Sequence, residues 1–391
     1  MIDPLIDEGP EDSERAALVA RARTLLVAAC VLVSLGLGVA KVFAQRAHRP
    51  HYLHDAHVYE GWPSIDGHSL KAAHIRTWMR GGDPGAAELR EFLSDEGHPS
   101  SLVVQSAVAA LSLFVGSIPV TFLLLSSLAF CLQILLVVRL ARLCAPDAPP
   151  WVPTVAGVLA AGHVLSVRTA AQLHLDPFCA LVATAVLVAT LEQAREPRRG
   201  RAVGIAVLLA LGLFTKISLL PLLAVPPLVL AARAPGRRLA TLVRGGLAFS
   251  LPPLLVWGAA LWLLTGGGPT TTEPGHLLET WELDARHLRN FGVEMVLLLQ
   301  AFPLLLLLGR REQGPDERAV GLVLIVILAA TWAFRLPPIP RLYLPAVGLL
   351  AVLGALRLGR LLPGRLVSTV LVLYLLANWG LGIAGLMSQV P

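Results

Sequence analysis

Uninterrupted apolar runs, each about the length of a membrane-spanning helix, recur along most of this chain. A helix of roughly 20 apolar residues crosses the hydrocarbon core of a bilayer, which is about 30 Å thick. Of the 391 residues, 55% are hydrophobic and only 15% are charged, which is more apolar surface than a soluble protein can bury. The sequence therefore predicts an integral membrane protein with many spanning helices.

The composition also argues against several other classes of protein. The net charge of +6 comes from arginines between the apolar runs, without the dense basic tract of a nucleic-acid-binding domain. The cysteines Cys30, Cys131, Cys144 and Cys179 lie in or at the ends of apolar runs and form no CxxC or CxxH pair. They indicate neither a disulfide framework nor a zinc site, so we expect small apolar packing residues.

The arginines between the runs predict the orientation of the helices. Arg15, Arg21 and Arg23 precede the first run at 24–44, so the positive-inside rule places an N-terminal tail at 1–23 in the cytoplasm. The segment 45–118 then forms the first extracytoplasmic loop, in which the mildly apolar stretch 101–116 is expected to lie against the membrane as a helix. Further crossings are expected at 119–140, 151–172, 177–194, 202–216, 217–232, 246–264, 291–309, 319–334, 342–356 and 366–387.

These expectations define an all-α polytopic membrane protein with about eleven transmembrane helices in a single domain over 1–391. A second extracytoplasmic loop is expected at 265–290. The bias toward Ala, Leu and Arg is typical of a bacterial protein, so the expected location is the inner, cytoplasmic membrane.

Polar residues near the predicted outer ends of the helices are the candidates for function, because a charge at bilayer depth costs at least about 2.5–3.5 kcal/mol. They are Asp55 with its neighbouring histidines, His98, Arg168, His174, Asp176, Lys216, Arg335, Arg341 and Tyr343. No comparable residue is expected in the middle of a helix, which weakens the case for a proton-coupled transporter with a site at the bilayer midplane.

Five short motifs follow one another in the order found in a known enzyme family. They are HDAHVYEGWPSIDGHSLKAAHIRTWMRGGDP at 54–84, GHPSSL at 97–102, LHLDPFCALVATAVL at 173–187, LFTKISLLPLLAVP at 213–226 and PRLYLPA at 340–346. Their order and spacing over residues 24–350 resemble the GT-C membrane glycosyltransferases, and among these the aminoarabinose transferases of lipid A and the protein O-mannosyltransferases.

The resemblance implies an inverting enzyme that moves a sugar from a polyprenyl-phosphate carrier to a lipid, polysaccharide or protein acceptor on the outer side of the membrane. Such a transfer requires a base for the acceptor hydroxyl and cationic groups for the departing phosphate. By motif position, Asp55 is the candidate general base and Asp176 a second catalytic carboxylate. The remaining matches are His98, Lys216 and Arg341 for the donor phosphate, and Tyr59 and Tyr343 for substrate contact.

Structural explanations compete with these roles. Asp176 can stabilise the start of a helix through the helix dipole. Lys216 can mark the end of a crossing by reaching the lipid headgroups, and Arg341 and Tyr343 can be interfacial anchors. These explanations stay open beside the functional ones.

Histidines are dense in the first outer loop, at His48, His51, His54, His57, His68, His74 and His98. Imidazole binds zinc and copper, but a three-residue step rotates around a helix and completes no recognised metal site. We therefore expect loop residues that titrate near neutral pH beside an anionic phosphate.

Ala56 departs from the family, whose members usually carry an acidic residue directly after the first-loop aspartate. This difference leaves open whether a divalent metal ion takes part; the motifs require no other cofactor. From the sequence we also expect no counterpart of the additional helices or soluble module of many relatives after the last predicted crossing. Two alternative functions stay open: a transporter or flippase of lipid-linked sugars, and an inactive relative that acts as a partner subunit.

Overall fold

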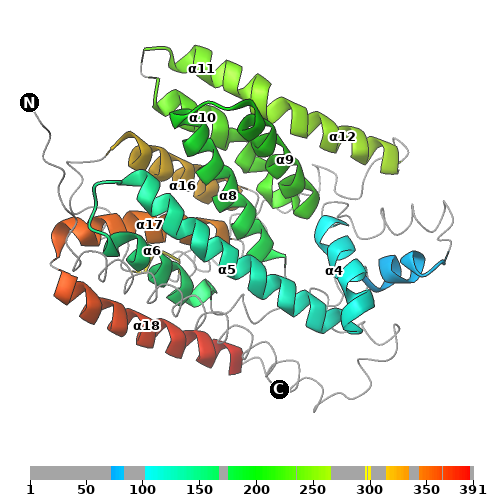
Figure 1. The fold of residues 1–391 in the computed structure, drawn as a ribbon, viewed down its shortest axis with the longest axis horizontal. Coiled ribbons are helices and arrows are strands. Elements are labelled where there is room, and N and C mark those ends of the chain that lie inside the picture. Colours follow the sequence, from blue (N-terminus) through cyan, green and yellow to red (C-terminus); the bar gives the residue numbers. More distant parts are fainter. Residues whose placement is uncertain are drawn as a thin grey trace, which may run out of the picture.

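The computed structural model describes residues 72–82, 102–166, 175–234, 236–265, 296, 298–300, 314–333, 343–362 and 364–387. The main elements within these ranges are all helices, as predicted (Figure 1). They are α4 (Leu102–Val115), α5 (Ile118–Cys144), α6 (Trp151–Gly162), α8 (Asp176–Arg195), α9 (Arg199–Thr215), η4 (Ile217–Ala224), α10 (Val225–Ala232), α11 (Arg238–Gly245), η5 (Gly246–Ser250), α12 (Leu251–Thr265), α16 (Pro315–Ala333), α17 (Leu344–Leu361) and α18 (Gly364–Met387).

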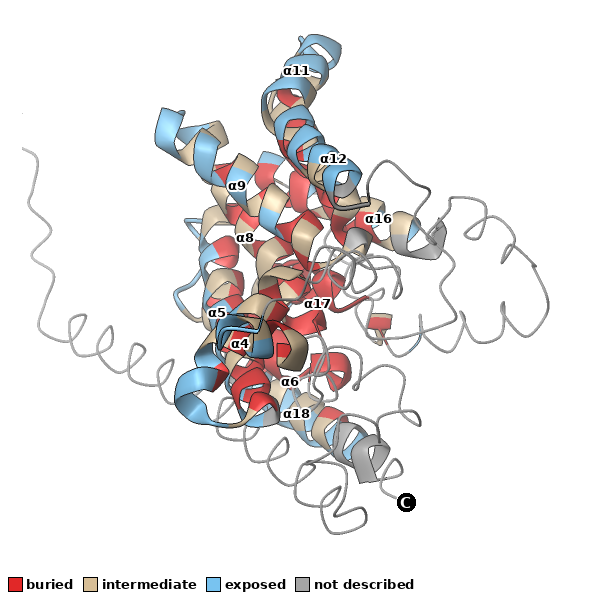
Figure 2. Ribbon diagram, turned by 90° about the vertical axis from the view of Figure 1, so that its right-hand side faces the viewer, coloured by how far each residue is buried: buried red, intermediate tan, exposed pale blue. Residues whose placement is uncertain are grey.

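Helix α17 forms the centre of the bundle. Its residues from Leu344 to Leu358 are all buried, and it packs against α5, α6, α8 and α16. Figure 2 shows it in the colour of buried residues, whereas α11 and α12 at the edge are largely exposed. Gly348 permits a close helix approach, because a Cβ there would lie 3.0 Å from Cγ2 of Val137 on α5. Small residues at such crossings are typical of helices packed within a membrane.

Four helices in the described ranges are long and apolar enough to cross a membrane: Val120–Cys144, Asp176–Arg195, Arg238–Ala260 and Leu344–Leu361. Large apolar side chains also face outward, and Leu128 on α5, Leu263 on α12 and Leu376 on α18 are each more than half exposed. Water solvates such a surface poorly, whereas lipid chains cover it without cost. The bundle is therefore that of a membrane protein, and the number of crossings in the whole chain stays a prediction.

The helix expected to lie against the membrane at 101–116 corresponds to α4. Figure 1 shows α4 at a steep angle to α5, beside the N-terminal end of α5. Val104 and Val108 pack in one cluster with Phe122 of α5. The turn between the helices contains Gly116, whose φ of +81° is disfavoured for a residue with a Cβ. The turn sets α4 apart from α5 as a separate helix, and its position on the membrane surface stays a prediction.

Two predicted crossings are interrupted in the structure. The helix expected at 151–172 ends at Gly162, because His163 has an extended backbone with φ −63° and ψ 137°. The segment expected at 217–232 starts as the 3-10 helix η4 and continues as α10. Pro221 inside η4 lacks an N–H group, so a regular α-helical hydrogen-bond ladder does not form there.

The other predicted crossings between 119 and 387 that the structure describes are helical to within a few residues of the expected bounds. The segment 246–264 belongs to a longer helical run from α11 through the π-helical turn η5 to α12. The first crossing at 24–44, most of the loop at 45–118, the loop at 265–290 after Thr265 and most of the crossing at 291–309 lie outside the described residues.

Candidate functional site

The candidate site lies where α8, η4, α16 and α17 meet. These elements line a small pocket of about 20 Å³, which is room for roughly one water molecule. The residues in its wall are Asp176 and Cys179 of α8, Ser218, Leu219, Pro221 and Leu222 of η4, Ile327 of α16, and Pro345 of α17. Asp176 brings a charged group to this otherwise mostly apolar lining. We refer to this cavity as the Asp176 pocket.

Asp176 is placed by the start of α8. It is the first residue of the helix, with Pro177 directly after it. Proline is favoured at this position because its fixed φ suits a helix and its missing N–H would have had no helical partner. A carboxylate in the first turn is also stabilised by the helix dipole. The structural and functional explanations of Asp176 are therefore compatible, since the same position orients the side chain toward the pocket.

Lys216 is placed by an extended residue between two helices. Its φ of −163° and ψ of 130° end α9 and begin η4. The Lys216 N–H donates to the carbonyl of Gly212 at 2.9 Å, and its own carbonyl accepts from Leu219 N–H at 3.0 Å. The N–H and the carbonyl of Lys216 are thus both hydrogen-bonded, which fixes the backbone at this residue.

The structure brings Asp176, in the pocket wall, together with Lys216, which directly precedes η4. Lys216 Nζ donates to Asp176 Oδ1 at 2.7 Å, a distance typical of a charge-assisted hydrogen bond. The side chain of Asp176 is 3% exposed and that of Lys216 is 24% exposed. A carboxylate this deeply buried requires a cationic partner to remain charged, and Lys216 provides one.

Tyr343 lies at the N-terminus of α17, two residues before the pocket residue Pro345. It is 4% exposed and packs within the main apolar core. The structure therefore brings Asp176, Lys216 and Tyr343 onto elements that converge at one pocket. Asp55, Tyr59, His98 and Arg341 lie outside the described residues, and their roles stay predictions.

A second group of charged residues, which the sequence did not reveal, lies at the other end of the same helices. Asp316 and Glu317 in the first turn of α16 are 4% and 1% exposed. Arg233 donates to both carboxylate oxygens of Asp316, from Nε at 2.6 Å and Nη2 at 2.7 Å, and Arg195 Nη2 lies 2.8 Å from Asp316 Oδ2. We call the six residues Arg195, Arg233, Asp316, Glu317, Arg357 and Arg360 the Asp316–Glu317 cluster.

Glu317, like Asp316, is bound by two arginines, which here come from α17. Arg357 Nη2 lies 2.8 Å from Glu317 Oε1, and Arg360 Nη2 lies 2.6 Å from Oε2. The side chains of Arg357 and Glu317 are each 1% exposed. The helix expected to end at 356 is therefore longer than predicted, because α17 continues to Leu361 and encloses Arg357.

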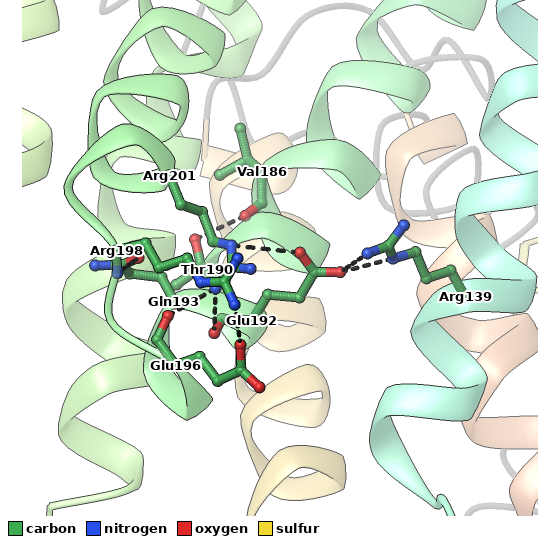
Figure 3. A network of polar contacts seen from close by, with 8 residues as sticks. All are labelled: Arg139, Val186, Thr190, Glu192, Gln193, Glu196, Arg198 and Arg201. Atoms are coloured by element: carbon green, nitrogen blue, oxygen red, sulfur yellow. Dashed lines mark hydrogen bonds and ion pairs between the residues drawn. The ribbon is translucent and has the colours of Figure 1, made fainter.

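A third polar group borders the Asp316–Glu317 cluster, around Glu192 near the end of α8 (Figure 3). Arg139 of α5 donates from Nε to Glu192 Oε1 at 2.6 Å, and Arg201 of α9 approaches Oε2 at 3.5 Å. The Arg139 side chain is 61% exposed, so this group is far more open to solvent than the Asp316–Glu317 cluster. In both groups arginines from different helices share one end of the bundle. The side of the membrane that this end faces stays a prediction.

Polar residues also occur inside the bundle, contrary to the expectation for helix centres. His163, fully buried at the break after α6, contacts the carbonyl of Leu298 with Nε2 at 2.9 Å, and its Nδ1 accepts from Leu165 N–H at 3.2 Å. The side-chain oxygen of Asn378 on α18 accepts from Val164 N–H at 3.1 Å. These contacts satisfy backbone groups that the helix break would otherwise leave unpaired in an apolar interior. These hydrogen bonds therefore explain how the helix break is tolerated inside the bundle.

Comparisons with known proteins add one finding. No protein-family model matches the sequence, and no curated protein sequence matches it. The crystal structure of ArnT from Cupriavidus metallidurans bound to undecaprenyl phosphate aligns with a TM-score of 0.54 and 18% sequence identity, over 95% of this chain and 63% of ArnT. The chain thus spans less than two thirds of the length of ArnT. The apo structure of the same ArnT aligns with a TM-score of 0.49 and 19% identity, over 72% of this chain and 51% of ArnT.

At this level of identity the similarity concerns the fold. It agrees with the helical architecture of the described residues and with the helices long and apolar enough to cross a membrane. ArnT is an aminoarabinose transferase of the GT-C family, and this chain has the same GT-C fold.

Proposed function

We propose that this chain is a GT-C-type glycosyltransferase that moves a sugar from a polyprenyl-phosphate carrier to a lipid, polysaccharide or protein acceptor. The reaction takes place on the outer face of the cytoplasmic membrane. The observation that carries the proposal is the Asp176–Lys216 ion pair beside a pocket, in a fold shared with a protein whose structure contains undecaprenyl phosphate. The pair lies at the ends of apolar helices, where a carrier whose tail lies among lipid chains presents its phosphate.

The chemical task of Lys216 is to stabilise the negative charge that develops on the departing phosphate. Asp176 holds its ammonium nitrogen at 2.7 Å and so fixes the direction of its remaining hydrogens. Because the pair itself is neutral, the phosphate requires further positive charge. The motif positions assign this charge to Arg341 and His98.

In the proposed reaction the acceptor hydroxyl oxygen attacks the anomeric carbon of the sugar, opposite the carrier. The bond from that carbon to the phosphate oxygen breaks, and its electron pair leaves with the carrier phosphate. Asp55 takes the proton of the acceptor hydroxyl as general base. Tyr59 and Tyr343 contact the substrates. The configuration at the anomeric carbon is inverted, and the carrier phosphate is released.

The contact with Lys216 also defines the role of Asp176. A divalent cation at this carboxylate would lie close to an ammonium group of like charge, which is unfavourable in a poorly hydrated site. Among the residues that the structure describes, no three His, Cys, Asp or Glu side chains are grouped so that they could hold a metal ion. We therefore assign Asp176 to the orientation of Lys216.

The proposal is tested with the purified protein, an undecaprenyl-phosphate-linked sugar and extracted envelope acceptors, with products identified by mass spectrometry. We expect transfer of the sugar by the unchanged protein and a loss of at least about 100-fold in Asp55→Asn, which keeps the side-chain shape but removes the base. Asp66→Asn, in the same predicted loop but outside the assigned residues, is the matched control and should keep its activity.

Other outcomes distinguish the alternatives. Movement of the lipid-linked sugar across vesicle membranes with the sugar–carrier bond intact would identify a transporter. Absence of turnover together with co-purification of an active relative would identify a partner subunit. Normal transfer by Asp55→Asn would contradict the assigned base.

A further inference from the structure

The elements that line the Asp176 pocket are the same elements that meet in the Asp316–Glu317 cluster. The pocket wall comes from α8, η4, α16 and α17. The cluster takes Arg195 from α8, Arg233 from the end of α10, which continues η4, the two carboxylates from α16, and Arg357 and Arg360 from α17. At a rise of about 1.5 Å per residue, the two sites lie roughly 15–25 Å apart along these helices. The helices thus connect both sites directly.

The geometry of the cluster restricts how these helices can move relative to one another. Arg233 binds both oxygens of Asp316, and Arg360 binds both oxygens of Glu317, at 2.6 Å and 3.3 Å. Such two-bond contacts depend on the mutual orientation of the planar guanidinium and carboxylate groups. A shift of α16 along α10 or α17 would break them and leave buried charges without partners, at a high free-energy cost. The cluster therefore has one strongly favoured arrangement.

We propose that Asp316 and Glu317 are positioning residues for the Asp176 pocket. They hold α8, α10, α16 and α17 in one register relative to one another. In this register the other ends of α8, α16 and α17, together with η4, which precedes α10, enclose the pocket. The importance of this for catalysis rests on the proposed function, because the pocket is the assigned site of the donor phosphate. The positioning itself is a property of the helices and is measurable without any substrate.

The Glu192 group provides a matched comparison within the same protein. Glu192 also binds two arginines at this end of the bundle, and its side chain is 17% exposed. It joins α8 to α5 and α9, however, and of these three helices only α8 contributes to the pocket wall. Loss of the Glu192 charge should therefore weaken the bundle locally and leave the packing around the pocket unchanged.

Cys179 is a natural reporter of the pocket, because it lies in the pocket wall and is 2% exposed. Cys131 on α5 is 8% exposed, is not part of that wall, and reports general loosening of the bundle. Two full-length proteins are prepared, each with a single cysteine, at position 179 or 131, and with the other cysteines replaced by serine or alanine. The rate of modification by N-ethylmaleimide is measured in membranes, well below the unfolding temperature.

We expect Asp316→Asn to raise the modification rate of Cys179 roughly tenfold and to change that of Cys131 less than about twofold, since only the pocket opens. Arg233→Lys keeps the charge but removes the two-bond geometry, and should raise the Cys179 rate by about threefold. If the Asp316→Asn protein does not accumulate in the membrane, the Arg233→Lys protein provides the test. Glu192→Gln should leave the Cys179 rate within about twofold of the parent.

Equal acceleration at both cysteines, an unchanged Cys179 rate in both cluster variants, or an equal effect of Glu192→Gln would overturn the proposal. These rates require no donor and no acceptor, so they stand if the chain proves not to transfer sugars. Conversely, sugar transfer by the unchanged protein with normal Cys179 rates in the cluster variants would contradict the positioning role alone.

Discussion

The two ends of α8 carry charge in different ways. At its start, Asp176 meets Lys216 beside a pocket, and the lysine side chain is 24% exposed. At its end, Arg195 belongs to a cluster in which four guanidinium groups surround two carboxylates that are at most 5% exposed. The first arrangement places a charged pair beside a small pocket, whereas in the second both carboxylates are paired with arginines inside the protein. Burial of charge alone therefore does not identify a functional site in this bundle.

The difference has an energetic reason. A buried charge is expensive unless hydrogen bonds from well-oriented partners replace its hydration, and the Asp316–Glu317 cluster provides these partners from three helices. The Asp176–Lys216 pair depends less on the protein, because the Lys216 side chain is 24% exposed. We therefore expect substitutions in the cluster to act mainly on stability and substitutions in the pair to act mainly on ligand binding.

The largest effect is expected for Glu317→Gln. It leaves the guanidinium of Arg357, whose side chain is 1% exposed, without its full counter-charge and should lower the free energy of unfolding by about 3–5 kcal/mol. The double variant Glu317→Gln with Arg357→Met removes both buried charges and should regain most of this loss. Unfolding in detergent, followed by circular dichroism, measures both. A double variant no more stable than the single one would show that the arginine was not the source of the cost.

A smaller effect in free energy, but a large one in activity, is expected at the other end. Lys216→Met removes the assigned phosphate ligand and should lower kcat/KM by about 100-fold. It also leaves Asp176 buried at 3% exposure without its counter-charge, which lowers stability. Asp176→Asn combined with Lys216→Met should restore the stability but not the activity. Recovery of activity in this double variant would contradict the role of Lys216, and thermal unfolding beside the transfer assay separates the two quantities.

These two predictions also show what the sequence could reveal. Asp176 and Lys216 were found because they follow known motifs and interrupt apolar runs. Their contact could not be predicted, since 40 residues separate them and the extended backbone at Lys216 that aims the side chain depends on the packing of η4. The helices themselves were predicted because a run of about 20 apolar residues has few alternatives in a membrane.

Asp316 and Glu317 were missed for a different reason. The rule that orients the helices counts Lys and Arg and gives acidic residues little weight, so it gave no reason to single out these two carboxylates. The acidic first turn after Pro315 is typical of a helix start and could have indicated α16 but not the contacts of its carboxylates. His163 was missed because it lies within one apolar run that we expected to form a single helix.

The smallest effect is expected for Arg139→Gln, which tests how far the contrast between the two ends depends on burial. Arg139 contacts Glu192 closely, but its side chain is 61% exposed, so solvent and salt weaken the attraction. The substitution should lower the free energy of unfolding by less than about 1 kcal/mol, and this loss should shrink as salt is added. Unfolding of Arg139→Gln and Glu317→Gln at low and high salt measures the difference directly. If both lost the same stability at every salt concentration, burial would not explain why one group of arginines holds the helices in place while its exposed neighbour does not.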